Sequence, residues 1–190
     1  NKPILKGEGL GEVTVILDKA SGKRATSLTP DSFKIEKKFR VLHDILYFVN
    51  KDDPTGPAPL HPETDPQYAG FEAGVAAWAQ KQGLQNEEPP IGEDDVHVLD
   101  NIPRVTIVAP VTGSRITTST PLQTQASAPR GVARMEVALN DIVVARTQGS
   151  SLIATLDVSS VPPGFHTLTA YAYDDIDNKG TASVTINVTR

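Results

Sequence analysis

Apolar and polar residues alternate with a period of two along most of the chain after residue 104. Seven short runs rich in β-branched residues follow one another there: 105–109, 122–127, 132–139, 142–146, 152–158, 166–174 and 182–188. In the third run, Met135, Val137 and Leu139 share one face while Arg134 and Glu136 share the other. Turn-forming residues separate the runs. Seven such strands predict an immunoglobulin-like β-sandwich.

A helical period is clearest between residues 65 and 83. Tyr68, Phe71, Val75 and Trp78 recur at the spacing of one helix face. The dipeptide Asp65-Pro66 supplies a cap and a proline suited to the first turn. Gly83 is a typical residue just beyond a helix end.

Two further segments of the first half predict extended structure. Val13–Leu17 reads as a strand, and a second short strand around 24–28 would complete a hairpin with it. Residues 39–49 fit both a helical stripe and a strand. The abrupt stop at Asn50-Lys51-Asp52-Asp53-Pro54 favours the extended alternative.

These patterns predict two units, a small α+β domain followed by an all-β immunoglobulin-like sandwich. The expected division is a linker over 1–12, the small α+β domain over 13–88, a stiff acidic connector over 89–103 and the sandwich over 104–190.

Charge and composition narrow the range of partners. The formal net charge is −5, and residues 1–103 carry an excess of acidic residues that residues 104–190 lack. This argues against nucleic acid or an anionic membrane surface as the main partner. The absence of cysteine excludes disulfides and thiolate sites. The chain starts without Met, and we interpret it as a piece of a longer or processed protein.

Several stretches resemble a known family. VLHDILYFVNKDDPTGPAPLHPETDPQYAGFEAGVAAWA is similar to the region just after the transpeptidase domain of bacterial class A penicillin-binding proteins. Upstream of it, VILDKASGKRATSLTP resembles the hairpin that follows the active site in that family. TIVAPVTGSRI and GFHTLTAYAYDDIDNKG are similar to the immunoglobulin-like modules often appended there. These enzymes are membrane-anchored and build peptidoglycan.

The resemblance implies an accessory role, because the motifs of catalysis are missing from the sequence. The family acylates a serine in Ser-x-x-Lys and completes its site with Lys-Thr-Gly, and neither motif occurs here. We therefore expect no catalytic, cofactor-binding or metal-binding residue and no cofactor. The expected function is a non-catalytic extracytoplasmic module that supports or positions the enzyme, with peptidoglycan, cell-wall proteins and the upstream transpeptidase domain as partners. The alternative is a free-standing cell-surface adhesion or protein-interaction module.

The histidines and the acidic clusters are also candidates for metal binding or catalysis. None of the histidines, His43, His61, His97 and His166, pairs with another at helical spacing, so we expect hydrogen-bonded or exposed imidazoles. The acidic clusters 93–97 and 174–178 offer oxygens suited to calcium, although we interpret 174–178 as a solvated turn. Neither a carboxylate pair for glycoside hydrolysis nor a serine triad is indicated.

The aromatic residues leave two interpretations. Tyr68, Phe71 and Trp78 share a helix face, and Tyr47 and Phe48 precede it. They would either stack on sugar rings or pack in the core, where each ring contributes about 1.5–3 kcal/mol. Packing is favoured because a small domain has little else to bury. The five prolines of 54–66 would then form a structural clasp.

Overall fold

The computed structural model describes residues 11–190, which form two compact units. Unit 1 contains residues 11–17 and 35–92, and unit 2 contains Asp18–Lys34 and Glu93–Arg190. The predicted linker over 1–12 lies outside the described residues except for its last two. Among residues 11–190, none of the helices is long and apolar enough to cross a membrane.

The unit boundaries differ from the predicted division. Residues 18–34, expected in the small domain, and residues 93–103, expected in the connector, both belong to unit 2. The backbone N–H of Asp94 donates to the carbonyl of Arg24 at 2.8 Å, and Thr29 Oγ1 donates to Asp94 Oδ2 at 2.6 Å. These long-range hydrogen bonds attach the early segment to unit 2, whereas a division by composition assumes that each domain is continuous.

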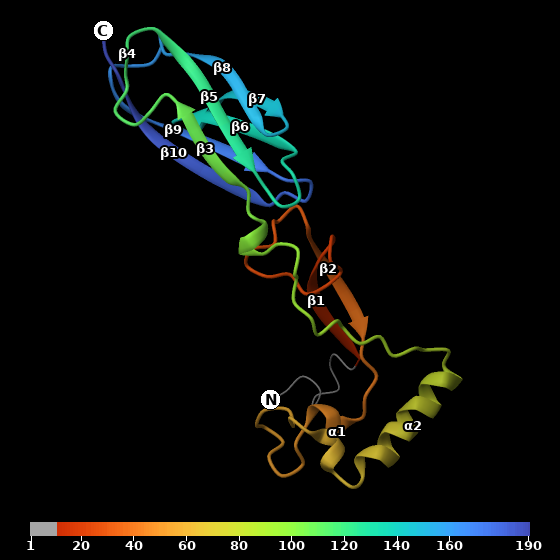
Figure 1. Cartoon of the computed structure of the whole chain (residues 1–190). Coiled ribbons are helices and arrows are strands. Elements are labelled where there is room, and N and C mark those ends of the chain that lie inside the picture. The colour runs from red at the N-terminus through yellow and green to blue at the C-terminus, as the bar shows by residue number, and fades with distance from the viewer. Residues whose placement is uncertain (1–10) are drawn as a thin grey trace. The chain divides into compact units, whose positions relative to one another are not determined.

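Unit 2 is a β-sandwich of two sheets (Figure 1). The five-stranded sheet has the order β4-β10-β9-β6-β7, and the three-stranded sheet has the order β3-β5-β8. The strands are β3 (Arg104–Ala109), β4 (Arg115–Ile116), β5 (Ser119–Ser127), β6 (Arg134–Leu139), β7 (Ile142–Gln148), β8 (Ser151–Asp157), β9 (Gly164–Tyr173) and β10 (Lys179–Val188). The predicted sandwich and its seven strands are confirmed. The short strand β4, which pairs in parallel with the end of β10, was not predicted.

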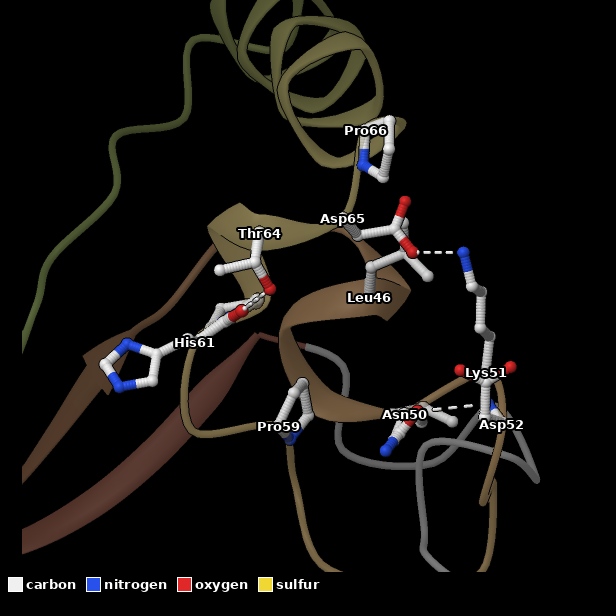
Figure 2. A pocket seen from close by; sticks show the side chains of 11 residues that line it. Leu46, Asn50, Lys51, Asp52, Pro59, His61, Thr64, Asp65 and Pro66 are labelled. Atoms are coloured by element: carbon white, nitrogen blue, oxygen red, sulfur yellow. Dashed lines mark hydrogen bonds and ion pairs between the residues drawn. The ribbon is translucent and has the colours of Figure 1, made fainter.

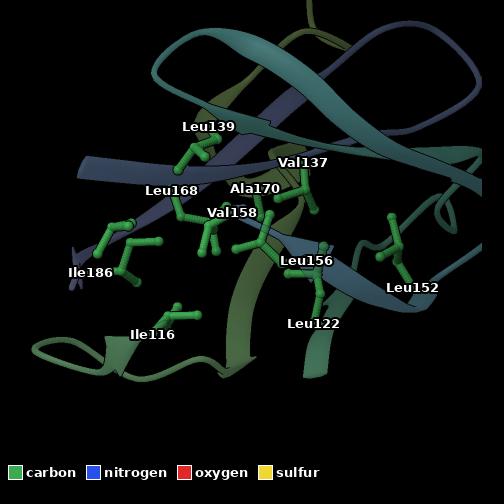
Figure 3. Close-up of a cluster of buried hydrophobic side chains, with 11 residues drawn as sticks. Ile116, Leu122, Val137, Leu139, Leu152, Leu156, Val158, Leu168, Ala170 and Ile186 are labelled. Atoms are coloured by element: carbon green, nitrogen blue, oxygen red, sulfur yellow. The ribbon is translucent and has the colours of Figure 1, made fainter. Parts of the chain in front are cut away.

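The alternating pattern places one set of side chains between the two sheets. Leu168 on β9 and Val137 on β6 are fully buried there, and Leu122 and Leu156 face them from the second sheet. Figure 3 shows these side chains converging from both sheets. Burying each large aliphatic side chain contributes about 1.5–3 kcal/mol, so this cluster is the main source of stability in unit 2.

The first element of unit 1 is a two-stranded sheet in which β1 (Glu12–Asp18) pairs with β2 (Lys34–Arg40). The prediction that residues 24–28 form the strand paired with Val13–Leu17 was wrong, because those residues form bends and an isolated bridge. Leu17, Phe39 and Val41 form a small buried cluster beside Val15 and Phe48.

The segment 39–49 is only partly extended. Strand β2 ends at Arg40, and residues Ile45–Phe48 form the single helical turn α1. Asp44 explains the change, because its carboxylate accepts the N–H of Leu46 at 2.9 Å and caps the turn. The preference for a fully extended segment was therefore wrong.

Helix α2 (Tyr68–Lys81) follows the 3₁₀ turn η2 (Pro62–Thr64) and confirms the predicted helix (Figure 1). Asp65 accepts the N–H of Gln67 at 2.9 Å. Gly83 adopts φ +67°, a left-handed conformation that costs glycine little, and the N–H of Leu84 returns to the carbonyl of Ala79 at 2.9 Å.

Candidate functional site

The rings of α2 are not buried as the favoured interpretation required. Phe71 is 53% exposed and Trp78 is 52% exposed, whereas Ala79 is the one buried residue of the helix. Helical spacing correctly placed the two rings on one face. The prediction that this face packs into a core was wrong, because the described residues leave about half of each ring uncovered.

A stacked pair of rings lies beside this helix face. His43 and Tyr47 stack with ring centroids 3.8 Å apart and an angle of 13° between the planes. His43 Nδ1 lies 3.1 Å from Glu72 Oε2, which fixes the imidazole against α2. His43, Phe71 and Trp78 contribute to an open hollow of about 510 Å³. The hollow combines ring faces with imidazole and carboxylate groups, the combination that suits a ligand with both apolar and hydroxylated surfaces.

The proline strip, residues 54–66, lines a second open pocket of about 350 Å³ together with residues of 46–52 (Figure 2). Figure 2 shows Lys51 reaching toward Asp65, directly before Pro66, and their side chains form an ion pair at 2.6 Å. The hydrogen bond from Lys51, together with the N–H of Gln67, lowers the pKa of Asp65, and Asp65 in turn raises the pKa of Lys51. The contacts join the strip to the start of α2, which supports its interpretation as a clasp.

Residues 174–178 form the predicted turn between β9 and β10, but only Asp175 is exposed, whereas Asp174, Ile176 and Asn178 are buried, so the expectation of a fully solvated turn was wrong. Asp174 is 1% exposed. Its Oδ1 accepts the N–H groups of Ile176 (3.0 Å) and Asn178 (2.9 Å), and its Oδ2 accepts the side-chain amide of Asn178 at 2.8 Å. The carboxylate thereby stabilises its own turn, and its oxygens are already engaged by N–H donors rather than directed at a calcium ion.

The other acidic cluster, 93–97, contains two buried residues, Asp94 and His97. His97 Nδ1 lies 2.7 Å from Asp94 Oδ2, and its Nε2 lies 3.0 Å from the carbonyl oxygen of Ile176. A second carboxylate, that of Asp18 at the end of β1, also approaches this imidazole, with its Oδ1 3.5 Å from His97 Nδ1. All three side chains are completely inaccessible to solvent.

Asp94 stays ionised in this setting. Burial by itself raises the pKa of its carboxyl group, but hydrogen bonds from Thr29, from the backbone of Val96 and from His97 outweigh burial. Together they lower the pKa of Asp94 to about 2.

The histidines confirm the expectation of hydrogen-bonded or exposed imidazoles. His61 is exposed and His166 is half-buried, both are hydrogen-bonded, and His43 and His97 have the partners described above. Sequence reasoning missed the grouping of Asp18, Asp94 and His97 because it looked for histidine pairs. The spacing Asp94-x-x-His97 was the available signal, whereas nothing local indicated Asp18.

Part of the sandwich of unit 2 matches a known protein family. Residues 103–170 match the family model described as bacterial Ig domain. The chain is similar to fibronectin(III)-like modules of Clostridium thermocellum CbhA, with 18% identity, a TM-score of 0.40 and coverage of 45% of this chain and 94% of that chain.

Two further solved structures have lower identity. One is an endo-beta-1,4-mannanase from Thermotoga petrophila, with 14% identity, a TM-score of 0.41 and coverage of 75% and 29%. The other is the CARDB domain of a Pyrococcus furiosus protein, with 13% identity, a TM-score of 0.34 and coverage of 47% and 97%. The curated protein sequences give no significant match. From its sheets and its family match, the sandwich of unit 2 has the fold of a bacterial Ig-like domain.

Proposed function

We propose that this chain is a non-catalytic extracytoplasmic module of a class A penicillin-binding protein and helps to hold that enzyme at peptidoglycan. Three features support the proposal. The strip 41–79 resembles the region after the transpeptidase domain, the sequence lacks Ser-x-x-Lys and Lys-Thr-Gly, and unit 2 has a bacterial Ig-like sandwich, a type of domain that is generally non-catalytic and often extracellular.

The exposed rings of α2 are the observation that carries the binding role. Phe71 and Trp78 present about half of their surfaces on one helix face, next to the stacked pair His43 and Tyr47. Large exposed rings are costly for a small unit and mark binding surfaces when they gather in one place. The glycan strands of peptidoglycan offer flat sugar faces for stacking, and their hydroxyl groups suit the imidazole and carboxylate groups nearby.

Cosedimentation with purified peptidoglycan tests the binding role. We expect the double variant Phe71→Ala/Trp78→Ala to bind at least about tenfold more weakly, which corresponds to about 1.4 kcal/mol. Phe165→Ala is the matched control, because Phe165 is a 76% exposed ring on the sandwich. Equal binding by the wild type and the double variant would contradict the assignment of this surface.

Labelling with a fluorescent penicillin tests the non-catalytic role. We expect no covalent label on the purified 190-residue chain, because acylation requires a serine activated by a nearby lysine. A labelled serine would overturn this part of the proposal.

A free-standing cell-surface adhesion or interaction module is the alternative, and the match to the bacterial Ig domain favours it equally. The gene that encodes this chain distinguishes the two. A preceding transpeptidase domain with Ser-x-x-Lys supports the first function, and repeated sandwich modules without such a domain support the second.

A further inference from the structure

Unit 2 contains three metal-ligating side chains grouped in its interior. Asp18, Asp94 and His97 each direct one ligand atom toward the others, and these three atoms all lie within 4.8 Å of one another. The distances from His97 Nδ1 are 2.7 Å to Asp94 Oδ2 and 3.5 Å to Asp18 Oδ1. Two carboxylates and an imidazole form a donor set found in zinc sites.

One of these atoms lacks a partner. Asp18 Oδ2 accepts the N–H of Ser21, but Asp18 Oδ1 is buried and has no hydrogen-bond donor in the structure of residues 11–190. A buried carboxylate oxygen without a donor or a cation is costly, because it has lost its hydration and gained nothing in exchange. The orphaned oxygen lies 3.5 Å from His97 Nδ1, whose single proton is directed at Asp94 at 2.7 Å, so Asp18 Oδ1 is the ligand position that the protein itself leaves unfilled.

The surrounding hydrogen bonds orient the three ligands. His97 Nε2 donates to the carbonyl of Ile176 at 3.0 Å, which fixes the ring and leaves Nδ1 as the atom directed at both carboxylates. Thr29 Oγ1 donates to Asp94 Oδ2 at 2.6 Å, and the N–H of Val96 donates to Asp94 Oδ1 at 3.0 Å. Metal-binding histidines typically donate their second N–H to a carbonyl in this way, and ligating carboxylates are hydrogen-bonded in turn.

We propose that Asp18, Asp94 and His97 bind one zinc-class divalent cation. Zinc ligands at about 2.0–2.2 Å in tetrahedral directions are separated by about 3.3 Å. The 3.5 Å separation of Asp18 Oδ1 from His97 Nδ1 fits this arrangement, and the 2.7 Å contact with Asp94 has to widen by roughly half an ångström. The cation takes the place of the Nδ1 proton, and its two positive charges balance the two carboxylates.

The donor set distinguishes zinc from calcium. Calcium prefers six to eight oxygen ligands, whereas the cluster supplies only two carboxylates and an imidazole nitrogen. Imidazole nitrogen favours zinc and its transition-metal neighbours. The inference does not depend on the proposed cell-wall function, since the cluster lies in unit 2 and the exposed rings lie in unit 1.

Thermal unfolding of the full 190-residue chain tests the proposal. After treatment with EDTA and dialysis, we expect Zn²⁺ at about one hundred times its dissociation constant to raise the melting temperature by roughly 10 °C. The same concentration of Ca²⁺ should leave it unchanged. Co²⁺ should bind with a stoichiometry of one and give the intense visible absorption of a tetrahedral site.

Asp18→Asn provides the decisive variant and Asp95→Asn its control. Asp18→Asn should lose the Zn²⁺-dependent shift and the Co²⁺ absorption, whereas Asp95→Asn should retain both, because the Asp95 side chain is 61% exposed and pairs with Lys23 outside the cluster. If Asp18→Asn does not fold, the wild-type measurements decide alone. A wild-type chain whose melting temperature is the same with EDTA and with Zn²⁺, and which shows no Co²⁺ absorption, overturns the proposal.

Discussion

The two units differ in how many apolar side chains they bury and in how they bury them. The largest buried cluster of unit 2 contains eleven side chains drawn from two facing sheets, whereas that of unit 1 contains Leu17, Phe39 and Val41. Helix α2 adds only Ala79 to the buried residues and leaves its rings half exposed. Two facing sheets bury every second side chain, but a single helix face is buried only where another element covers it. Unit 2 therefore has an extensive buried core, whereas the α2 face leaves its apolar surface accessible.

The largest effect should come from the sandwich core. Leu168→Ala removes a fully buried side chain from β9 and should reduce the free energy of unfolding by about 2–5 kcal/mol. Urea unfolding followed by near-ultraviolet circular dichroism, to which Tyr171 and Tyr173 on the same strand contribute, measures it. Ile153→Ala, at a 78% exposed position on β8, should change the value by less than about 0.5 kcal/mol. A loss below 1 kcal/mol for Leu168→Ala would show that this core is loosely packed.

A smaller loss of stability than that of Leu168→Ala should follow when one carbon atom is added at Gly180, near the start of β10. A Cβ at Gly180 would collide with the carbonyl oxygen of Pro103, a backbone atom that cannot rotate away. Gly180→Ala should therefore destabilise unit 2 by about 1–3 kcal/mol. Gly74→Ala is the contrasting change, because a Cβ there meets nothing within 4 Å and the residue lies inside α2. It should stabilise unit 1 by about 0.5–1 kcal/mol, and thermal unfolding of both variants compares them.

Truncating a ring on α2 should cost less than either core change in unit 2. Phe71→Ala removes a half-exposed side chain, so about half of the usual burial energy is lost and the better helix propensity of alanine offsets part of it. The expected loss is about 0.5–1 kcal/mol. The fluorescence of Trp78, the only tryptophan of the chain, follows the unfolding of unit 1. A loss of 3 kcal/mol or more would restore the packing interpretation of these rings.

The smallest effect concerns an ion pair at the edge of unit 2. Burial raises the pKa of Asp177, but hydrogen bonds from Arg134 and Ser32 outweigh it and hold the pKa below its usual value. Because the folded pKa is lowered, this carboxylate stabilises the fold above its unfolded pKa near 4, and the contribution is lost as the pH falls through the folded value. Asp177→Asn should reduce stability at pH 7 by less than about 1 kcal/mol and by a smaller amount at pH 2, where the wild-type carboxylate is protonated to a greater extent. Melting curves at both pH values measure this, and an equal loss at pH 2 would show that the residue acts through packing.

The sequence predicted those parts of the fold that depend on local pattern. Alternation along residues 134–139 and 166–173 indicated both the strands and the face that is buried, because side chains of a strand point to opposite sides in turn. Gly83 indicated the end of α2 for a reason equally local. The predicted start was wrong by two residues, because α2 begins at Tyr68 and its N-cap, Gln67, has no side-chain cap, while Asp65 accepts the N–H of Gln67 just before the helix.

Long-range contacts account for what the sequence did not predict. Helical spacing indicated that Phe71 and Trp78 share a face, but it contains no information about whether another element covers that face. Asp18 lies more than seventy positions before Asp94, and only folding brings the two carboxylates together. The same contact makes unit 2 discontinuous in sequence, and composition alone therefore placed residues 18–34 in the wrong unit.

The discontinuity of unit 2 determines when it can be completed during synthesis on the ribosome. Residues 18–34 emerge early, but their hydrogen-bond partners in 93–97 and the strands that follow are translated only after the whole of 35–92. In a nascent chain, Asp18 therefore cannot reach Asp94 and His97 until residues 93–97 have been translated. Closing so long a loop costs entropy, so this attachment forms later than the local hairpins of the sandwich, and a chain terminated before residue 93 would leave the early segment without these hydrogen-bond partners.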